Sequence, residues 1–197
     1  MRTAWGYDVE NGIDPIISVS KFHEMTGNAY FTNNRAEAAV KAASQAIRNY
    51  CGWHVCPSVK CTAYPVGGSI VTKLPAAYVS SITKITENGR ELMANVDYEW
   101  RRDGLLKRTK HHRWNDSWDG IIAEYTAGYT DEAVPDLAEA VCAIAAGVLA
   151  VSPGVTSESA DGVSISFSAN AASVAAGLTS QQKKALDPYR VISSHAA

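Results

Sequence analysis

The chain lacks the features that would place it in a membrane, a secretory pathway or a catalytic family. It has no apolar run of about 20 residues, so no bilayer-spanning helix is expected. Residues 1–15 lack the basic start and apolar core of a secretory signal, which predicts a protein made and kept in the cytosol. No Walker loop, dinucleotide glycine pattern, nucleophile elbow or His-Glu-x-x-His motif occurs. The sequence therefore predicts neither an enzyme nor a cofactor.

Charge and cysteine are also scarce. A net charge of −2 gives no overall attraction to nucleic acid. The four cysteines are expected to be reduced and buried: Cys51, Cys56, Cys61 and Cys142. Three of them share residues 51–61 with His54, but no Cys-x2-Cys or His-x3-His pair is present, so we predict no metal site.

Alanine at helical spacing is the strongest pattern that the chain does contain. Between residues 33 and 57, apolar side chains recur every three or four positions, which places them along one face of an α-helix. These residues are Ala36, Ala39, Val40, Ala43, Ala46, Ile47, Tyr50 and Cys51. Thr32, Asn33 or Asn34 can cap the start of the helix, and Gly52 is the expected left-handed stop.

A second alanine-rich helix is predicted to begin at Pro135, because proline suits the first helical position, and to run to about Ala150. After Glu139 no charged residue occurs through Val151, so apolar side chains surround this helix. A helix that is apolar all round is expected to be buried all round. Two kinds of neighbour would bury this helix: the rest of a helical domain in the same chain, or a neighbouring subunit.

Between residues 58 and 128 the pattern changes to alternation with a period of two, which is typical of antiparallel strands. Strands are predicted over residues 59–64, 69–73, 78–86, 90–93, 98–101, 105–108 and 121–126. Asn88-Gly89 and Asp103-Gly104 are strong hairpin signals. The predicted fold class is α+β, with an alanine-rich α-helical core domain, an inserted small antiparallel β module and a C-terminal helix and tail.

Shorter signals cover the remaining segments. Ser20 is expected to cap a short helix that Gly27 ends. After a polar loop, residues 162–167 alternate and predict a strand. Thr179 and Gln182 match a capping box for a last helix. The sequence predicts five segments. Residues 1–17 form an N-terminal arm, which is either extended or a disordered tail, residues 18–57 a first helical part, and residues 58–129 the β module. Residues 130–177 form a second helical part with a strand and a small-residue connector at 169–177, and residues 178–197 a C-terminal helix and tail.

Cations and tryptophans gather between residues 100 and 118. This cluster consists of Arg101, Arg102, Lys107, Arg108, Lys110, His111, His112 and Arg113, with Trp100, Trp114 and Trp118. Such a mixture suits contact with a nucleic-acid backbone or an acidic protein. The alternative is a solvated hairpin whose tryptophans fasten the loop to the sheet. No base-reading module accompanies the cluster, so a DNA-binding accessory protein, the alternative function, would bind without sequence specificity.

The run AAVKAASQAIRNYCGWHV at residues 38–55 resembles the head-to-tail connector, or adaptor, family of long-tailed bacteriophages. Shorter stretches add to the resemblance: the end of the first short helix at Thr26-Gly27, residues 97–100, 103–106, 125–129 and 134–137, Ser157-Glu158, and residues 186–190. The similarity extends over about residues 17–191.

The resemblance implies a structural virion protein that performs assembly without turnover. Its relatives form a dodecameric ring beneath the portal, extend the channel for genomic double-stranded DNA and dock the next neck, stopper or tail-completion protein. The protein would be made in the host cytoplasm and would need no membrane. The portal or partner contacts expected in this chain are Leu178, Leu186, Tyr189, Arg190 and Val191. The expected subunit-packing residues are Ala39, Ala43, Ala46, Ala138 and Ala145. The expected DNA-channel or neck contacts are Arg101, Arg102, Lys107, Arg108, Lys110 and Arg113.

Overall fold

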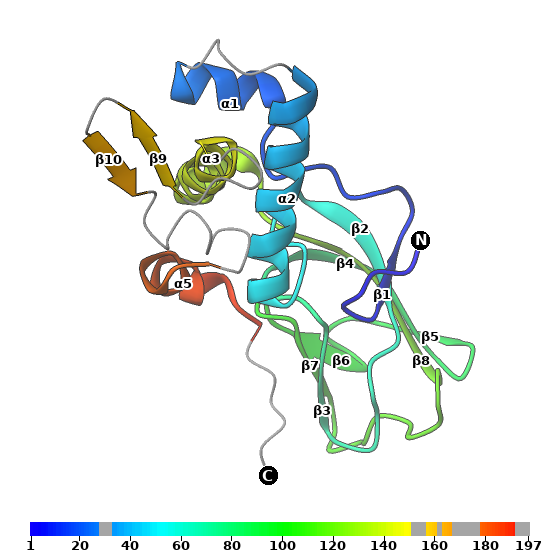
Figure 1. Cartoon of the computed structure of the whole chain (residues 1–197). Coiled ribbons are helices and arrows are strands. Elements are labelled where there is room, and N and C mark those ends of the chain that lie inside the picture. The colour runs from blue at the N-terminus through cyan, green and yellow to red at the C-terminus, as the bar shows by residue number, and fades with distance from the viewer. Residues whose placement is uncertain (28–32, 151–156, 161–162, 167–177, 192–197) are drawn as a thin grey trace. The chain divides into compact units, whose positions relative to one another are not determined.

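A computed structural model describes residues 1–27, 33–150, 157–160, 163–166 and 178–191 (Figure 1). The chain divides into two compact units, each discontinuous in sequence. The β-rich unit contains Met1–Asp14, Cys51–Thr130 and Tyr189–Ala197, and the helical unit contains Pro15–Tyr50 and Asp131–Pro188. The mixture of helices and antiparallel sheet confirms the α+β class. No helix in the described ranges is both long and apolar enough to cross a bilayer.

The helical unit begins with α1 (Val19–Thr26), which Gly27 ends at a φ of 58° as predicted. The predicted cap, Ser20, is wrong. Ser18 has extended backbone and its hydroxyl accepts a hydrogen bond from the amide of Lys21 at 3.1 Å, so it is the N-cap and Ser20 lies inside the helix.

The long predicted helix is α2 (Asn33–Cys51), and Gly52 follows it at a φ of 76°. Its alanine face is buried as predicted, while Glu37 and Lys41 form an exposed ion pair at 2.6 Å on the other side. The polar face of this helix, which the sequence predicts to be exposed, is not exposed throughout, because Ser44 and Arg48 are buried. The Ser44 hydroxyl accepts a hydrogen bond from the amide of Ile16 at 3.1 Å, which satisfies the polar group without water.

The second alanine-rich helix is α3 (Pro135–Ala150), which follows the short 3-10 turn η1 (Asp131–Ala133) and packs against α1. Leu137, Val141, Ile144 and Leu149 are buried, and Cys142 Sγ lies 3.7 Å from Met25 Sδ. The expectation of burial all round is wrong for the single chain. Ala143, Val148 and Ala150 are exposed, and Val148 is 36% exposed. Apolar side chains of α3 therefore remain exposed in the single chain.

Residues 162–167 contain the predicted strand, β10 (Val163–Ser166), which pairs antiparallel with β9 (Ser157–Ala160). The predicted polar loop is wrong over β9, because backbone pairing in a hairpin does not require apolar side chains. The predicted connector at 169–177 lies outside the described residues. The chain then forms α5 (Ser180–Leu186) and the 3-10 turn η2 (Asp187–Tyr189).

The β-rich unit contains two antiparallel sheets (Figure 1). The five-stranded sheet has the order β1-β2-β8-β4-β5 and the three-stranded sheet has the order β3-β7-β6. The strands are β1 (Tyr7–Val9), β2 (Val59–Ala63), β3 (Val71–Lys73), β4 (Val79–Glu87), β5 (Arg90–Leu92), β6 (Tyr98–Trp100), β7 (Leu105–Arg108) and β8 (Ile121–Ala127). Every strand predicted between residues 58 and 128 forms, with ends that shift by at most two residues.

Strand β1 lies in the segment predicted to be an arm. Tyr7 pairs with Ala63 and Val9 with Cys61, so residues 7–9 form an edge of the five-stranded sheet. The Val9 amide in turn donates to the Met1 carbonyl at 2.9 Å, which covers the outer edge of this strand. The prediction of an extended arm is confirmed for residues 7–9, and the alternative of a disordered tail is wrong there.

The two predicted hairpin turns differ in detail. Asn88 and Gly89 have φ values of 50° and 80°, the pair of positive values that a type I′ turn requires. At the second turn Gly104 has a φ of 83°, and the Leu105 amide donates to Asp103 Oδ1 at 3.3 Å. Asp103 itself does not have a positive φ, and its side chain stabilises this turn through the hydrogen bond instead.

Candidate interaction surfaces

The C-terminal helix α5 is held by the capping box that the sequence predicts. The Thr179 hydroxyl accepts from the Gln182 amide at 3.3 Å, and Gln182 Oε1 accepts from the Thr179 amide at 2.8 Å. Leu186 is 1% exposed, and the Tyr50 hydroxyl donates to Asp187 Oδ1 at 2.7 Å within the helical unit. Helix α5 is therefore fixed at both ends.

Residues Tyr189–Val191, here called the C-terminal strap, are bound to the β-rich unit. The indole N–H of Trp53 donates to the Tyr189 carbonyl at 2.6 Å, and the Val191 amide donates to the Cys51 carbonyl at 2.9 Å. The Tyr189 ring meets the edge of the Tyr129 ring with centroids 5.7 Å apart. The strap thus fixes residues 189–191 to the β-rich unit.

The five predicted portal contacts have different environments. Leu186 is buried in the chain itself, whereas Leu178, Tyr189 and Val191 are half-buried. Arg190 is exposed and offers a cation at the surface. Leu186 therefore holds α5 in place, while Arg190 is the candidate best placed to touch a partner.

Helix alanines predicted to pack between subunits are mostly covered within one chain. Ala39, Ala43, Ala138 and Ala145 are at most 8% exposed, and Ala46 is half-buried. Ala143 and Ala150 are exposed on one face of α3, and Val148 is exposed on a different face of the same helix. Periodicity identified the packed faces, but it did not distinguish a face covered by the same chain from a face left open.

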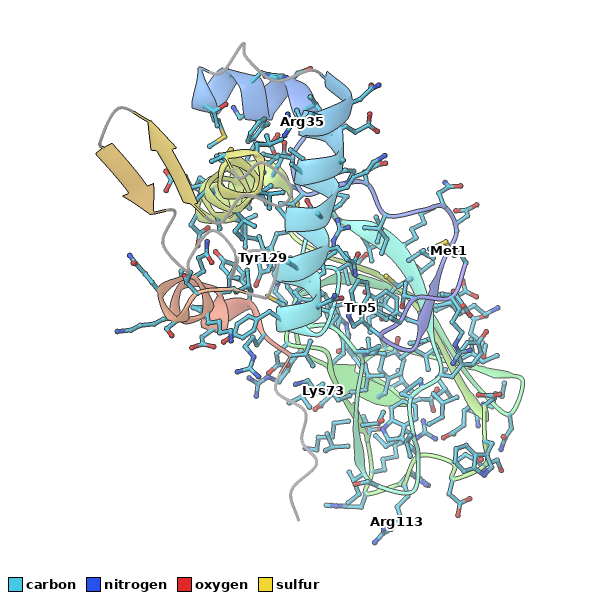
Figure 2. The ribbon with its side chains drawn as sticks, in the orientation of Figure 1. Met1, Trp5, Arg35, Lys73, Arg113 and Tyr129 are labelled. Atoms are coloured by element: carbon cyan, nitrogen blue, oxygen red, sulfur yellow. The ribbon has the colours of Figure 1, made fainter. Side chains whose placement is uncertain are left out.

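The residues of the basic cluster differ in whether their charges are already engaged within the chain. Arg101 Nη2 lies 3.0 Å from Asp103 Oδ2 in an ion pair, and Arg102 Nη1 donates to the Tyr78 hydroxyl at 3.2 Å. Lys107, Lys110 and Arg113 are exposed. Figure 2 shows Arg113 at one end of the β-rich unit.

Arg108 belongs to the interior of the β-rich unit. Its Nη2 lies 3.1 Å from Glu87 Oε2, and the two side chains are only 11% and 14% exposed. The guanidinium carbon is also 5.3 Å from the Trp114 ring centroid. This pair connects β7 of one sheet to β4 of the other, so the Arg108 guanidinium is engaged inside the chain and is poorly placed to touch DNA.

The tryptophans of the cluster have three different roles. Trp114 is buried and its indole N–H donates to the Leu106 carbonyl at 3.4 Å, so it fastens the loop as the solvated-hairpin alternative expects. Trp100 is half-buried. Trp118, in contrast, is 96% exposed and fastens nothing to the sheet.

His54 is an internal polar residue whose role the sequence did not reveal. It is fully buried, its Nε2 lies 3.0 Å from the Ala127 carbonyl, and its Nδ1 lies 2.7 Å from the Tyr7 hydroxyl. A carbonyl can only accept, so Nε2 carries the proton and Nδ1 accepts from Tyr7. His54 thus links strand β1, the end of α2 and strand β8 in the β-rich unit.

All four cysteines are reduced and buried, as predicted. Burial raises the pKa of the Cys61 thiol to about 12, so this thiol stays protonated and poorly nucleophilic. Within the described ranges, no group of three or more His, Cys, Asp or Glu side chains is arranged to hold a metal ion.

Comparisons with known proteins cover nearly the whole chain. A family model described as head completion protein, HCP, matches residues 15–192. A solved chain from the neck of an empty GTA particle, computed with C6 symmetry, superposes with a TM-score of 0.64 at 16% identity, covering 97% of this chain and 98% of that one. A chain from the neck of a native GTA particle, computed with C12 symmetry, gives a TM-score of 0.61 at 14% identity with the same coverage. No curated protein sequence matches the chain.

Proposed function

We propose that this chain, which belongs to the head completion protein family, is a structural protein of a virion neck. The family match is the observation that carries this proposal, because it spans residues 15–192 and names a step of head assembly. The shared fold with chains from the necks of GTA particles supports it. The role is assembly through surfaces, with no chemical turnover.

Copies of the chain form a closed ring beneath the portal, with twelve subunits as the proposed number. The two neck structures with C6 and C12 symmetry support a ring of this order. The exposed face of α3 that carries Ala143 and Ala150 is a surface that a neighbouring copy would cover. A symmetric portal raises the local concentration of subunits, so side-by-side contacts too weak for the free protein become favourable on the template.

The C-terminal segment, residues 178–197, carries much of the portal contact. The strap supports this proposal, because it fixes the chain at Val191 and leaves Arg190 exposed. The ring extends the DNA channel, and its far side docks the next neck protein.

Two truncations test the portal contact. A chain ending at Gly177 lacks α5 and the strap, and we expect it to lose binding to purified portal rings in a co-sedimentation assay. A chain ending at Val191 keeps the capping box, the Tyr50–Asp187 hydrogen bond and the strap, and serves as the matched control for folding. Portal binding at wild-type affinity by the shorter chain would refute the assignment of this segment.

The exposed cations Lys107, Lys110 and Arg113 are proposed to face either the DNA channel or the adjacent ring. Reversal to Glu at these three positions leaves the internal Arg108–Glu87 pair intact, so the fold should survive. We expect impaired DNA retention or impaired neck joining. Normal retention and normal joining together would exclude both roles. Salt-dependent DNA binding by the free monomer would instead favour the accessory DNA-binding function.

A further inference from the structure

The hairpin of β9 and β10 forms a separate two-stranded sheet (Figure 1). Among the described residues, each of its strands pairs only with the other. Neither strand packs extensively on another described element. A two-stranded hairpin without a third strand or a packed helix is only marginally stable in water. A further strand, supplied by another chain, would therefore stabilise it.

Both outer edges of the hairpin have backbone groups for such a strand. Only two residues separate the paired Ala160 and Val163, so this pair is joined by hydrogen bonds within the hairpin. Hydrogen-bonded and non-hydrogen-bonded pairs alternate along an antiparallel ladder. The next pair is Ser159 and Ser164, whose amides and carbonyls therefore point away from the hairpin, on the β9 side and the β10 side respectively.

The hairpin edges lack the protection found at the edges of the five-stranded sheet. Natural proteins protect edge strands with charged side chains, proline or a covering segment. The Met1 carbonyl covers β1 by accepting from the Val9 amide, and β5 contains the charged pair Arg90 and Glu91. Strand β10 has the sequence VSIS, with no charge and no proline, and β9 has Glu158 as its one charged residue. The edges of this hairpin are therefore suited to pairing with another strand.

We infer that β10 of one copy pairs with β9 of the next copy, so that a continuous antiparallel sheet runs round the ring. The inference rests on the proposed ring and identifies a contact between its subunits. Each copy presents two different edges, as the head-to-tail contact of a closed ring requires. Rotation about the ring axis keeps the direction of each strand along that axis. Strand β10 therefore runs antiparallel to β9 of the next copy, as it does to β9 of its own. Closure of the sheet leaves no edge unpaired.

Disulfide trapping between single-site variants tests this contact in rings assembled by the full chain on portal rings of the same particle. One variant is Ser164→Cys, on β10, and the other is Ser159→Cys, on β9. Isolated rings that contain both variants should give covalent dimers on a non-reducing gel, because the Cα atoms of paired strands lie within disulfide reach. A second mixture, with Ser157→Cys in place of Ser159→Cys, covers a register shifted by two residues.

Rings of each variant alone are the matched controls and should give only monomers. Equivalent strands of neighbouring copies lie two strand spacings apart, about 10 Å, which is too far for a disulfide. The native cysteines are buried and add little background.

Proline gives a second readout. Ser164→Pro removes the outward amide of β10 and keeps the hydrogen-bonded pairs of the hairpin, and proline is tolerated at such an edge position. We expect it to weaken ring assembly about tenfold without changing the melting temperature, because each junction loses a ladder hydrogen bond. Ser164→Ala keeps the amide and should assemble normally.

Three results would each overturn this contact and leave the proposed ring standing: normal assembly by Ser164→Pro, no dimers from either mixture, or dimers in rings of one variant alone. The disulfide result is independent of how well the proline variant folds. A wild-type chain that forms no ring on portals would overturn both the contact and the ring.

Discussion

The hydroxyl of Tyr7 provides a sharp test of whether the first residues belong to the folded β-rich unit. Tyr7 is fully buried; its hydroxyl donates to His54 Nδ1 at 2.7 Å and accepts from the His54 amide at 3.1 Å. Tyr7→Phe keeps the ring and removes both hydrogen bonds. Deleting one partner of a buried hydrogen bond costs about 1–3 kcal/mol, so we expect a loss of about 2 kcal/mol in the free energy of unfolding.

For a chain of this length, a loss of about 2 kcal/mol corresponds to a fall in melting temperature of about 4–8 °C. Tyr64→Phe is the control: Tyr64 is half-buried, its ring faces the Arg2 guanidinium at 5.5 Å, and no hydrogen bond of its hydroxyl is found among the described residues. Its effect should stay within about 0.5 kcal/mol. Denaturant titrations of both variants measure the difference. Equal stabilities for the two variants would mean that β1 does not hold the native sheet.

Three further predictions concern single residues of the β-rich unit. Because burial raises the pKa of the Cys61 thiol to about 12, an alkylating reagent in mild alkali should modify Cys61 only after unfolding, and rapid labelling of the native protein would contradict its burial. Gly128→Ala should destabilise the protein by well over about 1 kcal/mol, since a Cβ at this φ of 104° would lie 2.4 Å from the Pro57 carbonyl oxygen; an unchanged melting temperature would show that the backbone adapts. The hydrogen bond from the Met93 amide holds the pKa of the Asp97 carboxyl below its ordinary value, so the stability that this carboxylate contributes is present above the ordinary pKa and is lost as the pH falls through the lowered, folded-state pKa. The difference in stability between wild type and Asp97→Asn should therefore close in acid, and a constant difference would count against this carboxylate.

Local signals predicted much of the secondary structure. The alanine spacing of α2, the proline that begins α3 and the capping box of α5 each involve residues within one or two turns, so their physical causes are present in short windows of sequence. The Asn88-Gly89 turn was recognisable for the same reason.

The failures came from contacts between residues distant in the sequence. Strand β1 contains only three residues and forms because Tyr7 meets Ala63, which no local pattern indicates. The sequence predicts Arg108 to be a surface cation, but in the fold its Nη2 lies 3.1 Å from Glu87 Oε2. Spacing also does not distinguish alanines covered by the same chain from alanines that a partner covers, so the subunit-packing residues stay a prediction.

The central claim is that this chain completes a virion neck as a ring of copies on a portal. Electron microscopy of the purified protein mixed with portal rings tests it most directly. We expect an added layer of density with the rotational symmetry of a closed ring, into which the β-rich and helical units fit once per subunit. Portals that remain bare at saturating protein, with the chain still a solitary molecule in solution, would contradict the claim.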